Sequence, residues 1–217
     1  MKLPVNIKTN TDNNSKRVPC PEGVHSGVCV DVEDMGWIKS TYGWKGYIKV
    51  YFEAMVEDDD GNTKPMLVKS KRQNAVISGG ARKSNLYNLL DGWIGDGFTG
   101  DKEFDFSSLI GKAATLVVEE SSFLNDNNEE IQWAYVGVVK KNKKAVKPSG
   151  EWTVLTERDG YVPPEFTAFG EGPQEAQEER QAKRDQAKAD RESKPANEEP
   201  VKEEPAKKET NGDDVPF

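Results

Sequence analysis

Aromatic and basic residues alternate along one short stretch of the chain, GWIKSTYGWKGYIKVY, which begins at Gly36. Aromatic rings can stack on the flat faces of unpaired bases, and ammonium or guanidinium groups can pair with phosphates. A groove for single-stranded nucleic acid requires both residue types close together. The stretch therefore indicates binding chemistry that depends on stacking and charge and reads little sequence.

The candidate contacts come from this stretch and from a basic run further along the chain. Aromatic residues also pack well inside sheets, so Trp37 and Trp44 have an alternative place in the core. Trp133 and Tyr135 fit either face of a later strand. The residues that we predict to contact single-stranded DNA are Trp37, Lys39, Tyr42, Trp44, Lys45, Tyr47, Lys49, Tyr51, Lys69, Lys71 and Arg72.

Catalytic and metal-binding chemistry has less support in the sequence. His25 is the single histidine of the chain, and its position in a predicted strand is typical of a structural residue. Cys20, His25 and Cys29 supply three zinc ligands, so Asp31 or Glu33 would have to complete a four-ligand site. We expect ordinary reduced cysteines, and we predict no catalytic residue, no metal and no cofactor.

The composition indicates a folded domain joined to a charged segment that is not globular. Of the 217 residues 35% are hydrophobic and 31% are charged, and the formal net charge is −8. From Glu171 onward there are 14 acidic and 9 basic residues, which leaves 24 and 21 upstream. The upstream part is nearly balanced, so a local basic surface is compatible with an acidic chain.

Short runs with a period of two predict an antiparallel sheet from about residue 18 to residue 140. In YIKVYFEAMV, one face has Ile48, Val50 and Phe52, and the other has Tyr47, Lys49 and Tyr51. The turn Asp60-Gly61 then predicts a hairpin into the run MLVKSKR. In VHSGVCVDV the same period places Val24, Val28, Val30 and Val32 on the inner face, and His25, Cys29 and Asp31 on the outer face.

One short helix is predicted between the third strand and the fourth. Leu86, Leu89, Leu90 and Trp93 recur at helical spacing, with Ser84 as the N-cap and Gly95 near the end. The segments KAATLVVEE and IQWAYVGVVKK follow as two more strands. Three strands, a helix and two strands is the element order of the five-stranded OB-fold barrel, which is an all-β fold.

Two segments follow the predicted barrel. The aromatic residues of 152–169 predict that this extension either covers the barrel or pairs with a second protomer of a homo-oligomer. From Glu171 the chain favours helix by propensity but lacks an apolar stripe, so we expect a disordered, charged tail. A large hydrophobic residue at the end of such a tail is unusual, because it has no core to join.

The terminus DDVPF resembles the acidic tip of bacterial single-stranded DNA-binding proteins. The resemblance implies that the tip docks on replication and repair proteins, with its phenylalanine in an apolar pocket and its carboxylates against basic residues. Valine stands where that family usually has isoleucine or leucine. The matching residues are Asp213, Asp214, Val215, Pro216 and Phe217.

The predicted barrel is similar to a bacteriophage group of single-stranded DNA-binding proteins with the same fold. The similar segments are CPEGVHSGVCVDVEDMG, KSNLYNLLDGWIGDGFTG and FDFSSLIGKAATLVVEE. The likeness covers about residues 18–140 and implies a non-enzymatic role in phage DNA replication, recombination or repair.

The sequence thus predicts four regions: a disordered arm (1–17), a DNA-binding barrel (18–140), a linker or extension (141–170) and a tail with a protein-binding tip (171–217). No apolar run has the length of a membrane span, and the first residues lack the apolar centre of a signal peptide. We expect no membrane partner and a location in the cytoplasm of a bacterial host cell. The alternative is a protein-interaction module that imitates the host tip to divert host replication and repair proteins.

Overall fold

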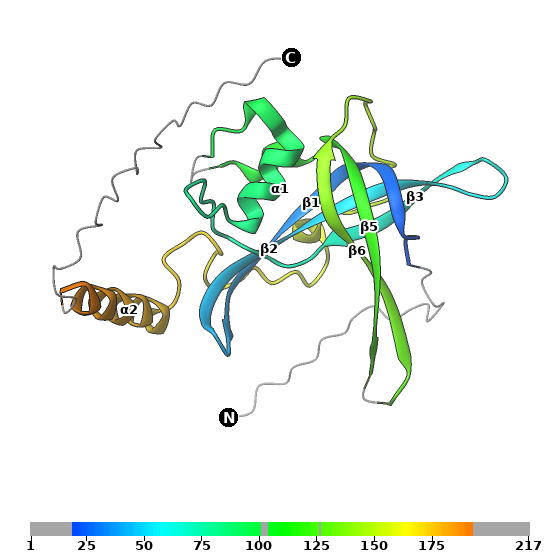
Figure 1. Ribbon diagram of the computed structural model, residues 1–217. Helices are drawn as coiled ribbons and strands as arrows, with labels where there is room; N and C mark the ends of the chain where they lie inside the picture. The colour runs from blue at the N-terminus through cyan, green and yellow to red at the C-terminus, as the bar shows by residue number, and fades with distance from the viewer. Residues whose placement is uncertain (1–18, 101–103, 126, 193–217) are drawn as a thin grey trace, which may run out of the picture. The chain divides into compact units, whose positions relative to one another are not determined.

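The computed structural model describes residues 19–100, 104–125 and 127–192, and most of the regular structure before residue 142 is β-strand (Figure 1). The strands are β1 (Gly23–Ser40), β2 (Gly43–Glu57), β3 (Thr63–Ser70), β4 (Gln73–Asn74), β5 (Ala113–Leu124) and β6 (Glu130–Lys141). The helices are α1 (Asn85–Ile94), α2 (Gln174–Glu192) and the short 3-10 turns η1 (Gly95–Gly97), η2 (Phe106–Leu109) and η3 (Leu155–Glu157).

Five of the described strands pair in a closed ring, in the order β1, β5, β6, β3, β2 and back to β1. Four of the pairings in the ring are antiparallel, and β3 pairs with β6 in parallel at Lys69 and Ser70. The short strand β4 adds to the edge of β2. The ring leaves each of its strands with one inner and one outer face.

The core lies inside the ring and beneath α1. Ile48, Val50 and Phe52 point inward from β2 and are almost completely buried, as the alternation predicted. The ring of Trp93 lies 5.3 Å from that of Phe52, and its Nε1 donates to the carbonyl of Ala113 at 2.9 Å. Full burial of a large apolar side chain stabilises a fold by about 1.5–3 kcal/mol, so these contacts fix α1 on the ring.

Both predicted ends of α1 are confirmed. The Ser84 hydroxyl accepts a hydrogen bond from the backbone N–H of Tyr87 at 3.1 Å and so caps the first turn. Gly95 has a φ of 70° and ends the helix, because the left-handed region suits a residue without a Cβ. The β2–β3 turn is also as predicted, with Gly61 donating to the carbonyl of Asp58 at 3.0 Å.

The predicted facing of β1 is wrong at its start. Val24 is 70% exposed, whereas Cys29 is completely buried in the core opposite Phe52. The pairing with β2 shifts register between Cys29 and Asp31, so a bulge there breaks the period of two. Val32, beyond the bulge, lies against the core as predicted.

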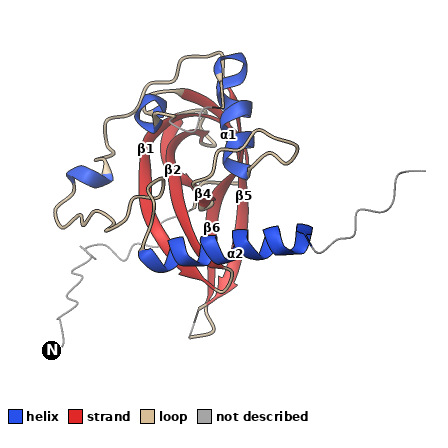
Figure 2. Ribbon diagram, turned by 90° about the vertical axis from the view of Figure 1, so that its left-hand side faces the viewer, coloured by secondary structure: helices blue, strands red, loops and turns tan. Residues whose placement is uncertain are grey.

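Residues 149–170, which we call the strap, pack on the outer face of β1 and β2. Figure 2 shows the strap, with its turn η3, running along the outside of β1. The sequence predicted that this segment either covers the barrel or pairs with a second protomer. Within the described chain it covers the sheet. Gly46 permits the close approach, because a Cβ at this position would collide with the backbone carbonyl of Ala168.

The described chain contains a second helix, α2, where the sequence predicted a disordered tail. Its residues are strong helix formers, and side chains four positions apart interact, as in Glu179–Lys183 and Gln181–Asp185. The chain divides into two compact units between Gln177 and Glu178. No helix among the described residues is both long and apolar enough to cross a membrane.

Candidate nucleic-acid interface

The outer faces of β2, β3 and β6 and the two residues just after β3 together provide six neighbouring aromatic and basic residues, which we call the open cluster. The register places Lys69 of β3 between Tyr51 of β2 and Tyr135 of β6. Trp133 lies two residues from Tyr135 on the same strand face. The members of the open cluster are Tyr47, Lys69, Lys71, Arg72, Trp133 and Tyr135.

Two of the three cations of the open cluster lie over aromatic rings. The Arg72 guanidinium lies 4.7 Å from the centre of the Tyr47 ring, and the Lys71 ammonium lies 3.8 Å from that of Tyr135. The rings of Trp133 and Tyr135 are 4.9 Å apart. Tyr135 is only 7% exposed and donates to Glu119, so its role is to hold Lys71 and Trp133 in place. Trp133 and Tyr47 are the half-exposed rings on which a base can stack.

The charges of the open cluster are not compensated. Lys69, Lys71 and Arg72 are all exposed, and none of them forms an ion pair with another described residue. A ring holds a cation by about 0.5–1 kcal/mol at an exposed site without removing its charge. These three side chains can therefore meet phosphates.

The hairpin tip between β1 and β2 has a second group of predicted residues, here called the tip cluster. The Lys39 ammonium lies 5.5 Å from the Trp44 ring, and the Lys45 ammonium lies 5.9 Å from the Tyr42 ring. Tyr42 is 81% exposed. Lys39 also forms an ion pair with Glu175 at 2.9 Å, and this hydrogen bond lowers the pKa of the Glu175 carboxyl.

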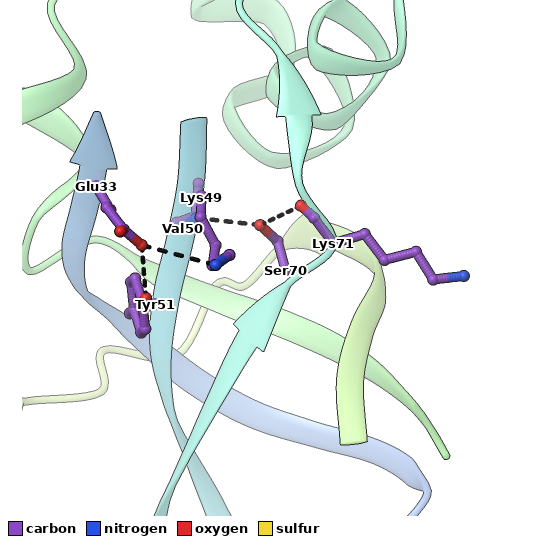
Figure 3. A network of polar contacts seen from close by, with 6 residues as sticks. All are labelled: Glu33, Lys49, Val50, Tyr51, Ser70 and Lys71. Atoms are coloured by element: carbon purple, nitrogen blue, oxygen red, sulfur yellow. Dashed lines mark hydrogen bonds and ion pairs between the residues drawn. The ribbon is translucent and has the colours of Figure 1, made fainter. Parts of the chain in front are cut away.

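Two predicted contacts, Lys49 and Tyr51, are half-buried and share a carboxylate partner. Figure 3 shows both pointing to the carboxylate of Glu33 on β1. The Tyr51 hydroxyl donates to Glu33 at 2.6 Å, and the Lys49 ammonium lies 3.7 Å from the same oxygen. Burial and the bond to Glu33 raise the pKa of the Tyr51 phenol well above its ordinary value. The charge of Lys49 is therefore already paired.

The strap provides its own aromatic and basic partners for this covered face. Trp152 stacks on Tyr51 with ring centres 5.5 Å apart, and the Arg158 guanidinium lies 4.0 Å from the Trp152 ring. The strap thus occupies the ring face of Tyr51 that a base would otherwise contact. Trp37 is covered in a similar way, since its backbone N–H donates to the carbonyl of Phe166 and its ring packs against Gly172.

Three carboxylates of the sheet hold the strap in place. Glu53 accepts from the backbone N–H and the hydroxyl of Ser149 at 2.6 and 2.7 Å. Asp31 accepts from the N–H of Leu155 at 2.7 Å. Asp34 accepts from the N–H of Ala168 at 2.9 Å. Asp31 and Glu53 are about 95% buried, so these hydrogen bonds offset the cost of burying their charge.

Sequence reasoning missed these three anchoring acids, which we call the strap anchors. Glu53 continues the outer face of Tyr47, Lys49 and Tyr51, but nothing in its sequence neighbourhood identifies a partner 96 residues away. The one available signal was an outward acid on a face otherwise made of aromatic and basic residues. Such an acid would repel phosphates unless another part of the chain engaged it.

The two cysteines and the histidine do not gather into a site in the described chain. Cys20 and Cys29 are free and buried, and burial raises the pKa of the first thiol to about 11 and of the second to about 12. The Nε2 of His25 lies 2.9 Å from the carbonyl of Pro21. Among the described residues there is no group of three His, Cys, Asp or Glu side chains that could hold a metal ion.

The predicted protein-binding tip, Asp213 to Phe217, lies outside the described residues. The predicted N-terminal arm, residues 1–17, does so as well. Comparison of the chain with protein-family models, with curated proteins and with solved structures gives no match. Function therefore has to be inferred from the sequence and from the geometry of the described sheet and strap.

Proposed function

We propose that this chain is a single-stranded DNA-binding protein that coats exposed strands with little sequence preference. The observation that carries the proposal is the open cluster, where three uncompensated cations lie beside half-exposed aromatic rings on one sheet face. Rings supply stacking to bases of any sequence, at roughly 1–3 kcal/mol for each base, and cations supply phosphate contacts. The proposed role is binding and does not include catalysis.

We propose further that the ring of strands is an OB-fold barrel. Its support is the connectivity: β1 pairs with both β2 and β5, β3 pairs in parallel with β6, and α1 lies between β3 and β5 in the chain. In that fold, the face of the second and third strands and the loops beside it bind oligonucleotides. Here Tyr47 of β2, Lys69 of β3 and the two basic residues just after β3 belong to the open cluster.

The two long hairpins fit the same proposal. The β1–β2 hairpin has the tip cluster, and both it and the β5–β6 hairpin project from the ring (Figure 1). A strand that follows the open cluster toward the β1–β2 tip would meet Tyr47 and then the pairs Lys39–Trp44 and Lys45–Tyr42. The predicted contacts Lys49, Tyr51 and Trp37 would then act mainly through the strap that covers them.

The acidic tip extends the proposal from DNA to proteins. The likeness of DDVPF to the bacterial tip supports recruitment of replication, recombination or repair proteins in a bacterial cell infected by a phage. A short motif of this kind binds weakly, so many copies on one coated strand would provide the avidity.

Fluorescence anisotropy of a labelled oligo-dT tests the proposal, with full-length protein titrated at several salt concentrations. We expect salt-sensitive binding, which the triple variant Lys69→Ala/Lys71→Ala/Arg72→Ala weakens by at least about ten-fold at low salt. Loss of three phosphate contacts should make the slope of log K against log salt less steep by about 2.

The matched control is the triple variant Arg82→Ala/Lys112→Ala/Lys140→Ala, which removes the same charge from exposed positions outside both clusters. We expect it to bind nearly as the unaltered chain does. Equal weakening by both triple variants would show that only net charge matters. No binding of oligo-dT at low salt would overturn the proposal, and a protein-interaction module would then be the better interpretation.

A further inference from the structure

A hollow of about 610 Å³ lies between the strap and the outer face of β3 and β6. Its size is within the range of ligand sites in proteins, roughly 300–1,000 Å³. Two tryptophans, Trp133 from β6 and Trp152 from the strap, are part of its lining. Leu67, Met66, Glu53 and Ser149 also line it.

The aromatic lining of this hollow continues the open cluster. Trp133 belongs to the open cluster and contacts Tyr135, beside which Lys71 lies. Trp152 contacts Tyr51, which pairs in register with Lys69. An occupant of the hollow would thus have two indole rings near it. The ammonium groups of Lys69 and Lys71, which form no ion pair with another described residue, lie on the adjacent part of the sheet.

The polar groups of the hollow favour a neutral occupant. Two of its charged lining residues, Lys64 and Glu151, are opposite in sign, so together they favour no net charge. Both carboxylate oxygens of Glu53 are engaged by Ser149, so this acid is not free to select a cation. The Nε1 of Trp152 is buried and has no hydrogen-bond partner among the described residues. Because this N–H has essentially no exposed area, it does not contact an occupant of the hollow, and recognition of the occupant falls to the indole rings.

The strap makes the hollow a preformed site. Two of the strap anchors, Glu53 and Asp31, are buried and hold residues on both sides of Trp152, at Ser149 and Leu155. Releasing the strap would expose these carboxylates on the face that phosphates approach. The strap is therefore a fixed wall, and a ligand does not have to order it on binding.

We infer that this hollow is a nucleobase subsite, in which one unstacked base of the bound strand stacks on Trp133 and lies beside Trp152 while its phosphates meet Lys69 and Lys71. The inference rests on the proposed function and deepens it, because it adds a binding site built by the strap. The strap accordingly contributes to recognition as well as covering Tyr51.

The test uses full-length protein and separates stacking from charge. Trp133→Ala should weaken oligo-dT binding by about 5-fold to 100-fold, the equivalent of one stacked base, and should leave the salt slope unchanged because no cation is lost. Trp133→Phe should restore most of the affinity. Thermal unfolding of each variant shows whether the fold is intact, and Trp133→Phe keeps the test valid if the alanine variant is unstable.

Fluorine NMR of protein labelled with 5-fluorotryptophan gives a second readout, since the chain has five tryptophans. Oligo-dT should shift the resonances of Trp133 and Trp152, and it should leave that of Trp93, which is 2% exposed in the core, unchanged. An abasic oligonucleotide of the same length should bind more weakly and leave the Trp152 resonance unshifted.

The outcomes distinguish the inference from the function on which it rests. If oligo-dT binds but the Trp133 and Trp152 resonances and the affinity of Trp133→Ala are unaffected, the subsite is wrong and DNA binding stands. If oligo-dT does not bind the unaltered chain, the proposed function fails. If the abasic strand shifts Trp152 as strongly as oligo-dT does, the hollow takes no base, and a protein side chain becomes the better occupant.

Discussion

The open cluster and the strap-covered half of β1 and β2 are built from the same kinds of residue. Both combine tyrosines with cations, and both have a tryptophan beside a tyrosine. In the open cluster, Lys71 and Arg72 lie over rings and face solvent. In the covered half, Lys49 is paired with Glu33, and Trp152 lies on Tyr51.

This contrast shows that residue types on a strand face do not by themselves determine whether the face is open to solvent or covered by another segment. The face is covered where a carboxylate lies close enough to pair with its cation and where a segment from elsewhere in the chain packs on its rings. One carboxylate, Glu33, engages both Lys49 and Tyr51. These two members of the aromatic and basic pattern therefore make an internal contact. Four predictions test whether the two halves differ in this way.

The largest effect is expected from removing a strap anchor. Glu53→Ala leaves the backbone N–H and hydroxyl of Ser149 without their acceptor, which should lower the free energy of unfolding by about 3 kcal/mol. The loosened strap should also be cut faster by trypsin at Arg158. Urea unfolding and limited proteolysis measure the two effects, and Glu57→Ala, an exposed acid on the same strand, is the control. An unchanged cleavage rate would mean that Glu53 does not hold the strap.

Next, Tyr47→Ala and Tyr51→Ala should have opposite profiles. Tyr47 is half-exposed, so its loss should weaken oligo-dT binding by about ten-fold and change stability by less than about 0.5 kcal/mol. Loss of Tyr51 removes the stack with Trp152 and the bond to Glu33, so stability should fall by about 2 kcal/mol with a smaller change in affinity. Anisotropy and urea unfolding of both variants measure this pair, and matching profiles would remove the distinction between the two halves.

A smaller effect separates Lys71 from Lys49. Replacing Lys71 with alanine should make the salt slope of binding less steep by about 0.7, which is the contribution of one phosphate contact on a single strand. Lys49→Ala should leave that slope unchanged, because Glu33 already compensates the charge. Salt titrations of the two variants measure the difference, and a lower slope in Lys49→Ala would place DNA beneath the strap.

The smallest effect concerns the Tyr51 phenol at alkaline pH. Burial and the Glu33 bond raise its pKa above the ordinary value of 10.0. Above about pH 10 the unfolded chain releases this proton while the folded chain retains it, so the stability contributed by the phenol is lost as pH rises. Tyr51→Phe should therefore reduce the loss of stability between about pH 10 and 11, as measured by urea unfolding. An equal loss in both proteins would contradict the contact with Glu33.

The sequence predicted the local features of the fold well. Alternation along β2 and the caps of α1 at Ser84 and Gly95 are confirmed, because each depends on neighbours within a few residues. The start of β1 was wrong, because the bulge near Val30 depends on the pairing with β2. The segment that forms α2 was expected to be disordered. It has helix propensity, but it lacks an apolar stripe that could pack against a core.

The candidate site was predictable only in part, for a related reason. Residues on β2 could be assigned to the outer face, but their exposure depends on Ser149, Leu155 and Ala168. Trp133 joins the open cluster through the parallel pairing of β3 with β6, which no local pattern indicates. Which outward residues meet solvent is thus a property of contacts distant in sequence.

The strap anchors also have a consequence for the order in which the chain matures. Their hydrogen bonds join residues 96, 124 and 134 positions apart, so they close some of the longest loops in the described fold. Contacts this distant form late, because the entropy of closing the loop is lost before the contact is gained. A nascent chain that has emerged only as far as β6 would still present three bare carboxylates on its outer face. Such a chain repels phosphates, so under the proposed function synthesis of the strap is the step that makes the outer face competent to bind DNA.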